Sequence, residues 1–311
     1  MPPSPKRPDW LAYAVLTVMP LMFSSNLVIG RAAMETMAPA TLAFWRWAIA
    51  ALVMVPFTWR AMRRNAGPIS EAALQFPILG LLGMMICGTF VYVSLRHTTA
   101  TNATLIYTTS PIYIILLERI FRGRPLRWKE LAGIAIAFSG AAVIIARGDW
   151  GVVTSFSFNI GDVGVLAAAI SWAIYSVILR NGPVAALPTA VSFTLIAAAG
   201  ALIILPSWIV EGLRTGFIPT GQSEWASVFG VAIIASVGAF SSYQFGVSRI
   251  GPTVAGIFLY ILPLYGVGLS IAFLGEQLHV YHGVGLVLVL TGVVIATTPG
   301  SRKVTAQTAS G

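Results

Sequence analysis

The chain has 311 residues, of which 57% are hydrophobic and 9% are charged, and its mean hydropathy is +0.84. A soluble domain usually carries about a quarter of its residues as Asp, Glu, Lys or Arg, so this composition excludes a monomer with a water-exposed surface. The net charge of +9 comes from short basic clusters between long apolar runs. A nucleic-acid-binding protein would instead gather these residues on one basic face. We therefore expect a membrane protein without a nucleic-acid partner.

The sequence lacks the motifs that mark the active sites of soluble enzymes. The single cysteine, Cys87, lies inside an apolar run, which excludes a disulfide framework and a CxxC metal site. There is no GxGxxG, Walker A or nucleophile-elbow motif. The three histidines, His97, His279 and His282, fall at expected loop ends, and no third ligand accompanies the closely spaced pair. We expect no catalytic residue, no metal site and no cofactor.

The apolar runs predict membrane-spanning helices, each of which needs about 20 mostly apolar residues. The first run is uncharged over residues 10–30, which is longer than the apolar region of a signal peptide, so we expect it to be retained. Residues 1–9 then form a cytoplasmic N-terminal segment, and 299–311 a cytoplasmic, disordered tail. Ten runs qualify as spans: 10–31, 40–59, 72–95, 98–118, 127–146, 160–180, 187–210, 225–248, 252–274 and 280–298.

The basic residues orient these spans. When the loops are assigned to alternate sides, fourteen Lys and Arg residues fall on one side and four on the other, while Arg46 lies within a span. Cytoplasmic loops carry an excess of Lys and Arg. The sequence therefore predicts a multi-pass protein in the lipid bilayer of the plasma membrane, the bacterial inner membrane, with both termini in the cytoplasm.

The chain contains an internal repeat. Shifted by 152 residues, positions 101–140 match 253–292 with ten identities in forty, including Pro111 with Pro263. Each copy, 10–146 and 160–298, holds five spans, and this odd number inverts the second copy in the membrane. The loop after the proline helix agrees, because it is basic in the first copy and lacks Lys and Arg in the second. We predict an all-α protein of ten transmembrane helices in two inverted five-helix repeats, an arrangement that recurs in secondary transporters.

One motif in the second copy points to a known family. The Pro263 helix is followed by Leu274-Gly275-Glu276, and then by Gly285 and Gly292. This pattern resembles the repeat signature of the drug/metabolite transporter superfamily, specifically its EamA-type ten-helix carriers, and the resemblance covers residues 10–298. The first copy departs from it, with Arg124 where the family commonly has Glu. The resemblance implies a central cavity among ten helices and export of small metabolites, often amino acids.

Arg46 is the one charged residue well inside a span, roughly 9 Å from its outer end at 1.5 Å per residue. It either captures a substrate carboxylate or phosphate, or it is a side chain flanked by Trp45 and Trp47 that extends outward or pairs with carbonyl groups. No Asp or Glu lies in a midplane segment. A carrier of organic cations would need a buried counter-charge there, so cationic substrates are disfavoured. Because no Asp or Glu lies in a midplane segment, the sequence does not identify the ion that is coupled to transport.

The other candidate residues are uncharged and lie in the middle of spans. Pro111 and Pro263 each free a backbone carbonyl, and we expect them to kink or gate their helices. Asn26 is a candidate for contacts between helices. The remaining polar and aromatic residues either line the substrate site or serve packing and bonds within their own helix: Tyr92, Tyr107, Thr108, Ser110, Trp172, Tyr175, Tyr243, Gln244 and Tyr260.

We expect a secondary transporter, not an enzyme, that exports small zwitterionic or weakly anionic metabolites such as amino acids by alternating access. One alternative is an exporter of lipophilic compounds or drugs. An intramembrane lipid-modifying enzyme is a further alternative, and the lack of convergent nucleophile, acid–base or metal groups disfavours it. Glycine-rich helix faces are compatible with a homodimer, although the internal duplication makes a monomer sufficient.

Overall fold

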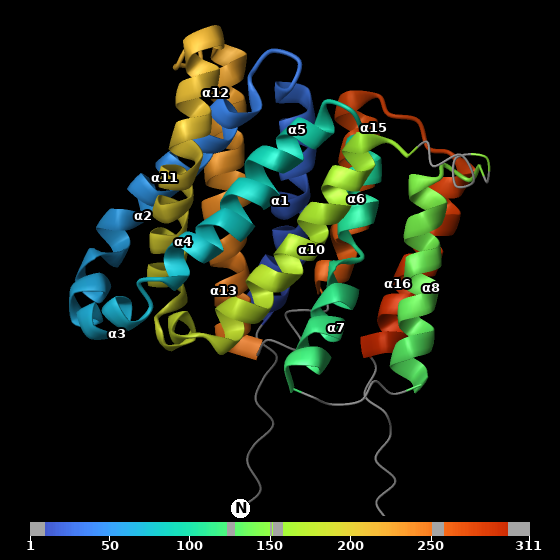
Figure 1. Ribbon diagram of the computed structural model, residues 1–311, viewed down its shortest axis with the longest axis horizontal. Helices are drawn as coiled ribbons and strands as arrows, with labels where there is room; N and C mark the ends of the chain where they lie inside the picture. Colours follow the sequence, from blue (N-terminus) through green and yellow to red (C-terminus); the bar gives the residue numbers. More distant parts are fainter. Residues whose placement is uncertain (1–9, 123–127, 150, 152–157, 251–257, 298–311) are drawn as a thin grey trace, which may run out of the picture.

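The computed structural model describes residues 10–122, 128–149, 151, 158–250 and 258–297. Within these ranges every regular element is a helix and none is a strand, which confirms the all-α prediction. Most helices run between the same two ends of the molecule, and the start of α1 and the end of α16 lie at one of these ends (Figure 1). We call the opposite end the distal end.

The chain forms these elements in order: α1 (Trp10–Ala33), α2 (Pro39–Arg64), α3 (Ala66–Glu71), α4 (Gln75–Leu79), the π-helix η1 (Gly80–Phe90), α5 (Val91–Leu95), α6 (Ala100–Tyr107), α7 (Ser110–Arg122), α8 (Trp128–Ile145), α10 (Ile160–Asn181), the 3₁₀-helix η2 (Pro183–Ala186), α11 (Thr189–Thr215), α12 (Gln222–Phe229), the π-helix η3 (Gly230–Gly238), α13 (Ala239–Ile250), the 3₁₀-helix η4 (Phe258–Ile261), α15 (Leu262–Leu274) and α16 (Val280–Thr297).

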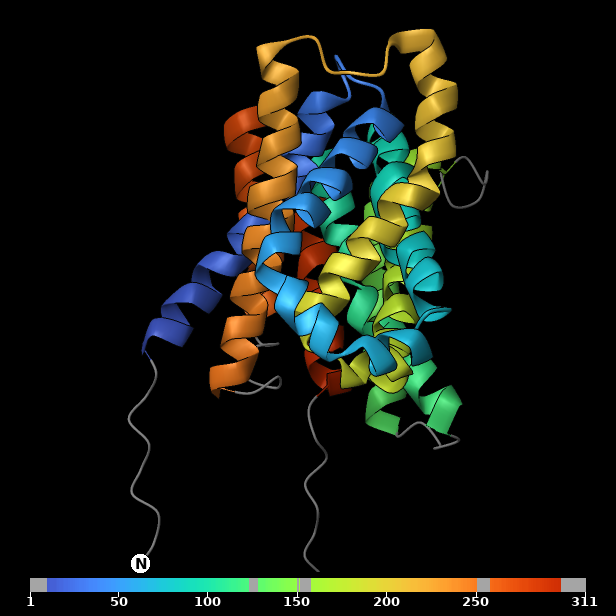
Figure 2. The ribbon, with the colours of Figure 1, turned by 90° about the vertical axis from the view of Figure 1, so that its left-hand side faces the viewer.

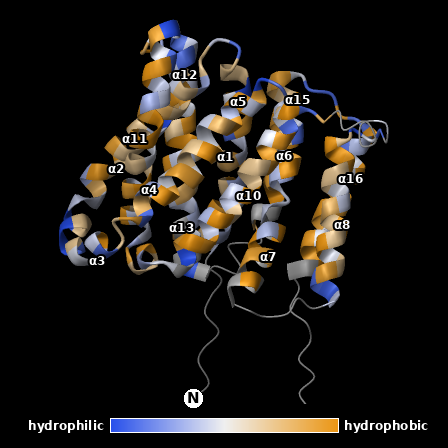
Figure 3. Ribbon diagram, in the orientation of Figure 1, coloured by the Kyte–Doolittle hydropathy of each residue, from blue (hydrophilic) through white to orange (hydrophobic). Residues whose placement is uncertain are grey.

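The helices have the surface of a membrane protein. Seven stretches of the described residues are long and apolar enough to span a bilayer, and two shorter apolar helices, Leu262–Leu274 and Val280–Ile295, accompany them. Figure 3 shows apolar residues along the helices and hydrophilic residues at the two ends. Large apolar side chains such as Phe57 (79% exposed) and Phe273 (75% exposed) face outward. Such a surface requires lipid or another apolar environment.

The expected proline span of the first copy is broken into two helices. Helix α6 ends at Tyr107 and α7 begins at Ser110, so Pro111 stands at the second position of a new helix. Proline is favoured there because its missing N–H lies among those that the first helical turn leaves unpaired. The span of the second copy repeats this design, since α15 has the same length as α7 and carries Pro263 in its first turn. The predicted kinks are therefore helix starts.

Two π-helices occupy equivalent places in the two copies. Segment η1 begins at Gly80 and η3 at Gly230, and each lies between two α-helical segments of one continuous span. π-helical turns are rare and are frequently found at functional sites. The sequence pattern does not predict these segments, because an apolar run is equally compatible with an α-helix and a π-helix.

Helices α8 and α16, the last helix of each copy, lie side by side at one edge of the molecule (Figure 1). Gly140 faces Gly285, where an added Cβ would lie 2.8 Å from the Gly285 carbonyl oxygen, and Gly292 faces the backbone at Gly133. The residue order runs in opposite directions along the two helices, so they are antiparallel. The glycines of each copy thus meet those of the other copy.

Helix α2 crosses between α11 on one side and the column of α12, η3 and α13 on the other (Figure 2). Small residues also let η1 pack tightly on α11, because a Cβ added to Gly80 of η1 would lie 2.9 Å from the Gly200 nitrogen of α11. The first-copy elements η1 and α5 also contact α2, so the inner face of α2 is enclosed by elements of both copies. Arg46 lies on this face.

Candidate functional site

Arg46 is buried, with 4% of its surface exposed. Its Nε donates to Ser236 Oγ at 2.8 Å, and its Nη1 donates to Asn26 Oδ1 at 2.6 Å and to Tyr92 Oη at 2.9 Å. The structure does not support the alternative of an arginine that extends outward to carbonyl groups, because these three bonds all go to buried or half-buried side chains. Asn26 does connect helices, as the sequence predicts.

The partners of Arg46 are themselves fixed. Tyr92 Oη donates to Asn26 Oδ1 at 2.8 Å, and Ser236 Oγ donates to the Val231 carbonyl oxygen at 2.9 Å. The second bond joins residues five apart, which is the spacing of the π-helical turn in η3. The four side chains come from α1, α2, α5 and η3, so both copies contribute to this arrangement, which we call the Arg46 cluster (Arg46, Asn26, Tyr92, Ser236).

The Arg46 cluster contains a positive charge without a counter-ion. No described acidic side chain forms an ion pair with Arg46, and its Nη2 donates no hydrogen bond to a described residue. The guanidinium carbon lies 4.2 Å from the centre of the Trp47 ring. Trp47 Nε1 is one of three buried polar atoms in the described part of the chain that have no partner. The Arg46 Nη2 group and the Trp47 indole N–H thus donate to no described residue at this buried charge.

Several aromatic residues named from the sequence lie close to the Arg46 cluster. Arg46 acts electrostatically on both Cys87 and Tyr107, and the Tyr107 hydroxyl lies beside the Cys87 thiol. The rings of Trp172 and Tyr175 stack with their centres 5.0 Å apart, as their spacing on one helix face predicts. Tyr175 is 3% exposed and also lies near Cys87.

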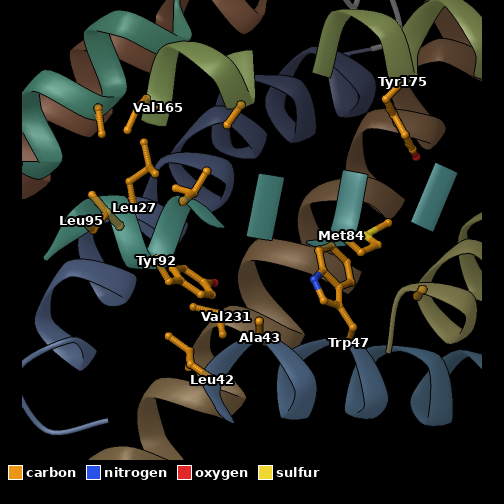
Figure 4. Close-up of a cluster of buried hydrophobic side chains, with 14 of the residues drawn as sticks. Leu27, Leu42, Ala43, Trp47, Met84, Tyr92, Leu95, Val165, Tyr175 and Val231 are labelled. Atoms are coloured by element: carbon orange, nitrogen blue, oxygen red, sulfur yellow. The ribbon is translucent and has the colours of Figure 1, made fainter. Parts of the chain in front are cut away.

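Glycines make room for the tyrosine rings. A Cβ at Gly30 would lie 2.6 Å from Tyr92 Cε1, and a Cβ at Gly83 would lie 2.8 Å from Tyr175 Cδ2. Figure 4 shows Tyr92 and Tyr175 entering the buried region from different helices, with Trp47 beside Met84. Two glycines in the neighbouring helices thus position two site residues, a relation that the sequence alone does not reveal.

Other predicted site residues lie elsewhere or bond within their own helix. Thr108 Oγ1 donates to the Thr104 carbonyl at 2.9 Å, and Ser110 Oγ donates to the Tyr107 carbonyl at 2.7 Å. Tyr243 packs in a separate group with Leu16 and Met19. The side chains of three further candidates lie outside the described part of the structure: Pro111, Gln244 and Tyr260.

Two groups of functional interest were not selected from the sequence. The sequence does not predict a role for Ser236, because a single serine in an apolar span is not unusual. Its contact with Arg46 joins residues that are 190 positions apart. His282, expected at a loop end, lies in the first turn of α16 and is 4% exposed. Among the described residues no group of three or more His, Cys, Asp or Glu side chains is placed to hold a metal ion.

The fold resembles that of one solved structure, and the sequence resembles those of several proteins named as transporters. A crystal structure with 20% sequence identity superimposes with a TM-score of 0.62 and covers 93% of this chain and 96% of its own. "Uncharacterized transporter YyaM" of Bacillus subtilis is 25% identical, over 84% of this chain and 85% of its own length. "Uncharacterized inner membrane transporter YedA" of Escherichia coli K12 is 24% identical, over 92% and 90%.

One relative has a substrate in its name. The "Probable terminal-alkyne amino-acid exporter" of Streptantibioticus cattleyicolor is 28% identical, over 78% of this chain and 84% of its own length. The model of the EamA-like transporter family matches this chain twice, at residues 10–146 and 159–298. The two matches together span nearly the whole sequence, and the chain belongs to the EamA-like transporter family.

Proposed function

We propose that this transporter exports small zwitterionic or weakly anionic metabolites, such as amino acids, by alternating access across the bacterial inner membrane. The observation that carries the proposal is the buried Arg46, which is held by neutral side chains and whose Nη2 donates to no residue that the structure describes. A guanidinium is well suited to a carboxylate because its N–H groups match the carboxylate oxygens in geometry and charge.

Energetics favour a ligand at this position. Removing a charged side chain from water costs several kcal/mol, and a hydrogen bond to a charged group returns about 1.5–3 kcal/mol. Three such bonds hold Arg46 in place without neutralising it. A substrate carboxylate would supply the missing negative charge and use the free N–H groups. This argument favours an anionic group on the substrate.

The substrate amine has no acidic partner among the described residues of the Arg46 cluster. The stacked Trp172 and Tyr175 rings offer aromatic faces that attract cations and apolar groups alike. Recognition would then rest mainly on the carboxylate, with the remainder of the substrate against aromatic surface. The relative named as an amino-acid exporter supports this substrate class.

The duplicated architecture supports alternating access with ten spans and both termini in the cytoplasm. Antiparallel packing of α8 and α16, the paired π-helices and the two family matches all relate the halves to one another. In transporters with inverted repeats, one repeat moves against the other around a site at their interface. The Arg46 cluster joins both halves and lies where such a site is expected.

The proposal is tested by export from proteoliposomes loaded with a defined mixture of amino acids and their hydroxy-acid analogues. We expect Arg46→Met to lower export at least about tenfold, since one hydrogen bond to a charged group accounts for roughly that factor. Arg46→Lys keeps the charge and should retain partial activity. The control is Arg63→Met, which removes an arginine that lies over Trp59 on α2. Unchanged export by folded Arg46→Met would contradict a role in substrate capture.

Amino-acid methyl esters distinguish the alternative of a lipophilic-compound exporter. They keep the amine and the side chain but lose the carboxylate, so they should neither be exported nor compete under our proposal. An exporter that uses only the aromatic surface would instead prefer the esters. Export of esters with no export of amino acids would favour that alternative and make Arg46 a packing residue.

A further inference from the structure

The side-chain amide of Asn26 is bonded only through its oxygen. Asn26 Oδ1 accepts from Arg46 Nη1 at 2.6 Å and from Tyr92 Oη at 2.8 Å. A guanidinium group only donates, so the amide must turn its oxygen toward Arg46 and its NH₂ group away from it. Asn26 Nδ2 donates to no residue that the structure describes. The amide therefore presents two N–H groups that no described residue accepts.

Arg46 Nη2 is in the same situation as Asn26 Nδ2. The guanidinium bonds to described residues through Nε and Nη1. In the described part of the chain, the fully enclosed polar side-chain atoms without a partner are Trp47 Nε1, Thr89 Oγ1 and Thr101 Oγ1. Neither Nη2 nor Nδ2 is among these enclosed atoms. Both nitrogens therefore border space that an atom of a ligand can occupy.

The two nitrogens lie close enough to bind one small group together. The 2.6 Å hydrogen bond joins Arg46 Nη1 to Asn26 Oδ1, and Nη2 and Nδ2 each lie two covalent bonds beyond it. Standard bond lengths then keep Nη2 and Nδ2 within about 8 Å of each other. A carboxylate can span such a distance, because each of its oxygens accepts a hydrogen bond at about 2.9 Å.

The surroundings of Arg46 leave one edge of the guanidinium for a ligand. The Trp47 ring covers one face, with its centre 4.2 Å from the guanidinium carbon, and Trp47 is 2% exposed. Nε and Nη1 are already bonded to Ser236, Asn26 and Tyr92. A ligand therefore reaches Nη2 along the plane of the guanidinium, which is the direction from which carboxylates bind arginine.

We propose that Asn26 binds the substrate directly, with Asn26 Nδ2 and Arg46 Nη2 donating to the two oxygens of one carboxylate. The amide oxygen of Asn26 holds the guanidinium in place, and its nitrogen contacts the substrate. Because both positions are donors, they favour a group that only accepts, as an ionised carboxylate does. The identity of the exported compound rests on the function proposed above, whereas the binding of a carboxylate to these two donors is tested without export.

The test without export uses nuclear magnetic resonance of purified protein in which the asparagine side-chain amides carry ¹⁵N. The chain has five asparagines, so few amide signals need to be resolved. The signal of Asn26 is assigned by its absence from the spectrum of Asn26→Asp or Asn26→Ser. We expect it to shift in a saturable manner when sodium acetate is added at constant ionic strength. The signal of Asn159, at the distal end of the molecule, should not shift.

Acetamide and sodium chloride serve as control ligands. Acetamide has nearly the shape of acetate but no charge, and hydrogen bonds to an ionised acceptor are roughly twice as strong, so an equal shift should need an about tenfold higher concentration. Folded Arg46→Met should lose the acetate shift. No acetate shift at Asn26, an equal shift with chloride, or an acetate shift that persists in folded Arg46→Met would each overturn the proposal.

The contribution to export is tested with Asn26→Asp in proteoliposomes. The new carboxylate still accepts from Arg46 Nη1 and Tyr92 Oη, so the variant should fold with an undiminished unfolding temperature. It offers no N–H group and places a negative charge where the substrate carboxylate binds. We expect amino-acid export to fall at least about tenfold, as one hydrogen bond to a charged group accounts for roughly that factor.

Asn159→Asp is the matched control for Asn26→Asp, because it keeps the oxygen that accepts from Gly161 N at the start of α10. It should export as the unmodified protein does, and unchanged export by folded Asn26→Asp would overturn the proposal. If acetate shifts the Asn26 signal but no amino acid is exported, the carboxylate site stands and the proposed substrate class is wrong. If amino acids are exported and the signal does not respond, only the role of Asn26 is wrong.

Discussion

The side chains around Arg46 hold its guanidinium in place without neutralising its charge. Asn26, Tyr92 and Ser236 each give one neutral acceptor, so the guanidinium keeps its full charge and a fixed orientation. A carboxylate partner would have stabilised the folded protein more strongly and would have competed with any anionic substrate. Neutral acceptors are thus compatible with reversible ligand binding.

Removing the hydroxyl of Tyr92 tests directly whether the orientation of the Arg46 guanidinium matters for export. Tyr92→Phe removes one of the two acceptors of Nη1 and the donor to Asn26, while the ring stays in its glycine-lined place. We expect the KM for export to rise about tenfold with a smaller change in kcat, as one hydrogen bond to a charged group is lost. The measurement is initial export rate against internal substrate concentration.

Tyr13→Phe is the matched control for that variant, because Tyr13 packs on Phe258 away from the Arg46 cluster. Its KM should match that of the unmodified protein. Equal KM values for Tyr92→Phe and Tyr13→Phe would mean that the position of Arg46 does not depend on Tyr92.

Sequence reasoning at the residue scale works where one residue breaks a pattern. Arg46 stands out as a charge in an apolar span, and Trp172 and Tyr175 are close because they lie on one turn of a helix. Ser236 gives no such signal, because its contact with Arg46 joins two segments that are distant in the sequence.

At the scale of elements, glycine contacts decide which helices approach closely. An added Cβ at Gly292 would overlap the backbone of Ala137 and Gly133 on α8, which cannot move aside as a flexible side chain can. Gly292→Ala should therefore lower the thermal unfolding temperature, because overpacking typically costs about 1–3 kcal/mol.

Gly283 lies on the same helix with no atom within 4 Å of its added Cβ. Gly283→Ala should leave the unfolding temperature unchanged or raise it, since alanine favours helices by up to about 1 kcal/mol. Both variants are measured in detergent micelles by thermal unfolding. If Gly292→Ala is as stable as Gly283→Ala, then α8 and α16 do not pack through these glycines.

The breaks within the expected spans are features of secondary structure that the sequence pattern does not predict. Apolar periodicity indicates helices well, and the proline positions were identified from the repeat. The same pattern cannot distinguish a kinked helix from the two helices α6 and α7, or an α-helix from the π-helix η1. These differences depend on single backbone hydrogen bonds, which tertiary contacts select.

For the whole molecule, the arrangement in the membrane remains a prediction from the basic residues. Ser70 after α2 and Ser223 at the start of α12 are both exposed and lie at opposite ends of the described structure (Figure 1). In a Cys87→Ser background, Ser223→Cys should react with a membrane-impermeant thiol reagent in intact cells. Ser70→Cys should react only after the cells are opened.

Reaction of both cysteines in intact cells, or of Ser70→Cys alone, would contradict the cytoplasmic location of the termini. The background is favourable because Cys87 is the only cysteine of the chain and the change to serine is nearly isosteric. Labelling from opposite sides requires an odd number of spans between the two sites, and the span assignment from the sequence predicts five there.

The crossing of α8 and α16 has a consequence for the history of this chain. Because Gly140 faces Gly285 and Gly133 faces Gly292, exchanging the two helices reproduces the same contacts. Such an interface forms equally well between two separate, identical polypeptides inserted in opposite directions. A fused descendant inherits it unchanged, but is free to diverge in one half. The earlier spans of the two copies align with an offset of 149 residues, which pairs Pro39 with Pro188 and Phe44 with Phe193. In this alignment Arg46 corresponds to Leu195, so the cation belongs to one half alone. A duplicated chain can therefore combine a symmetric helix interface with a charge that only one half carries.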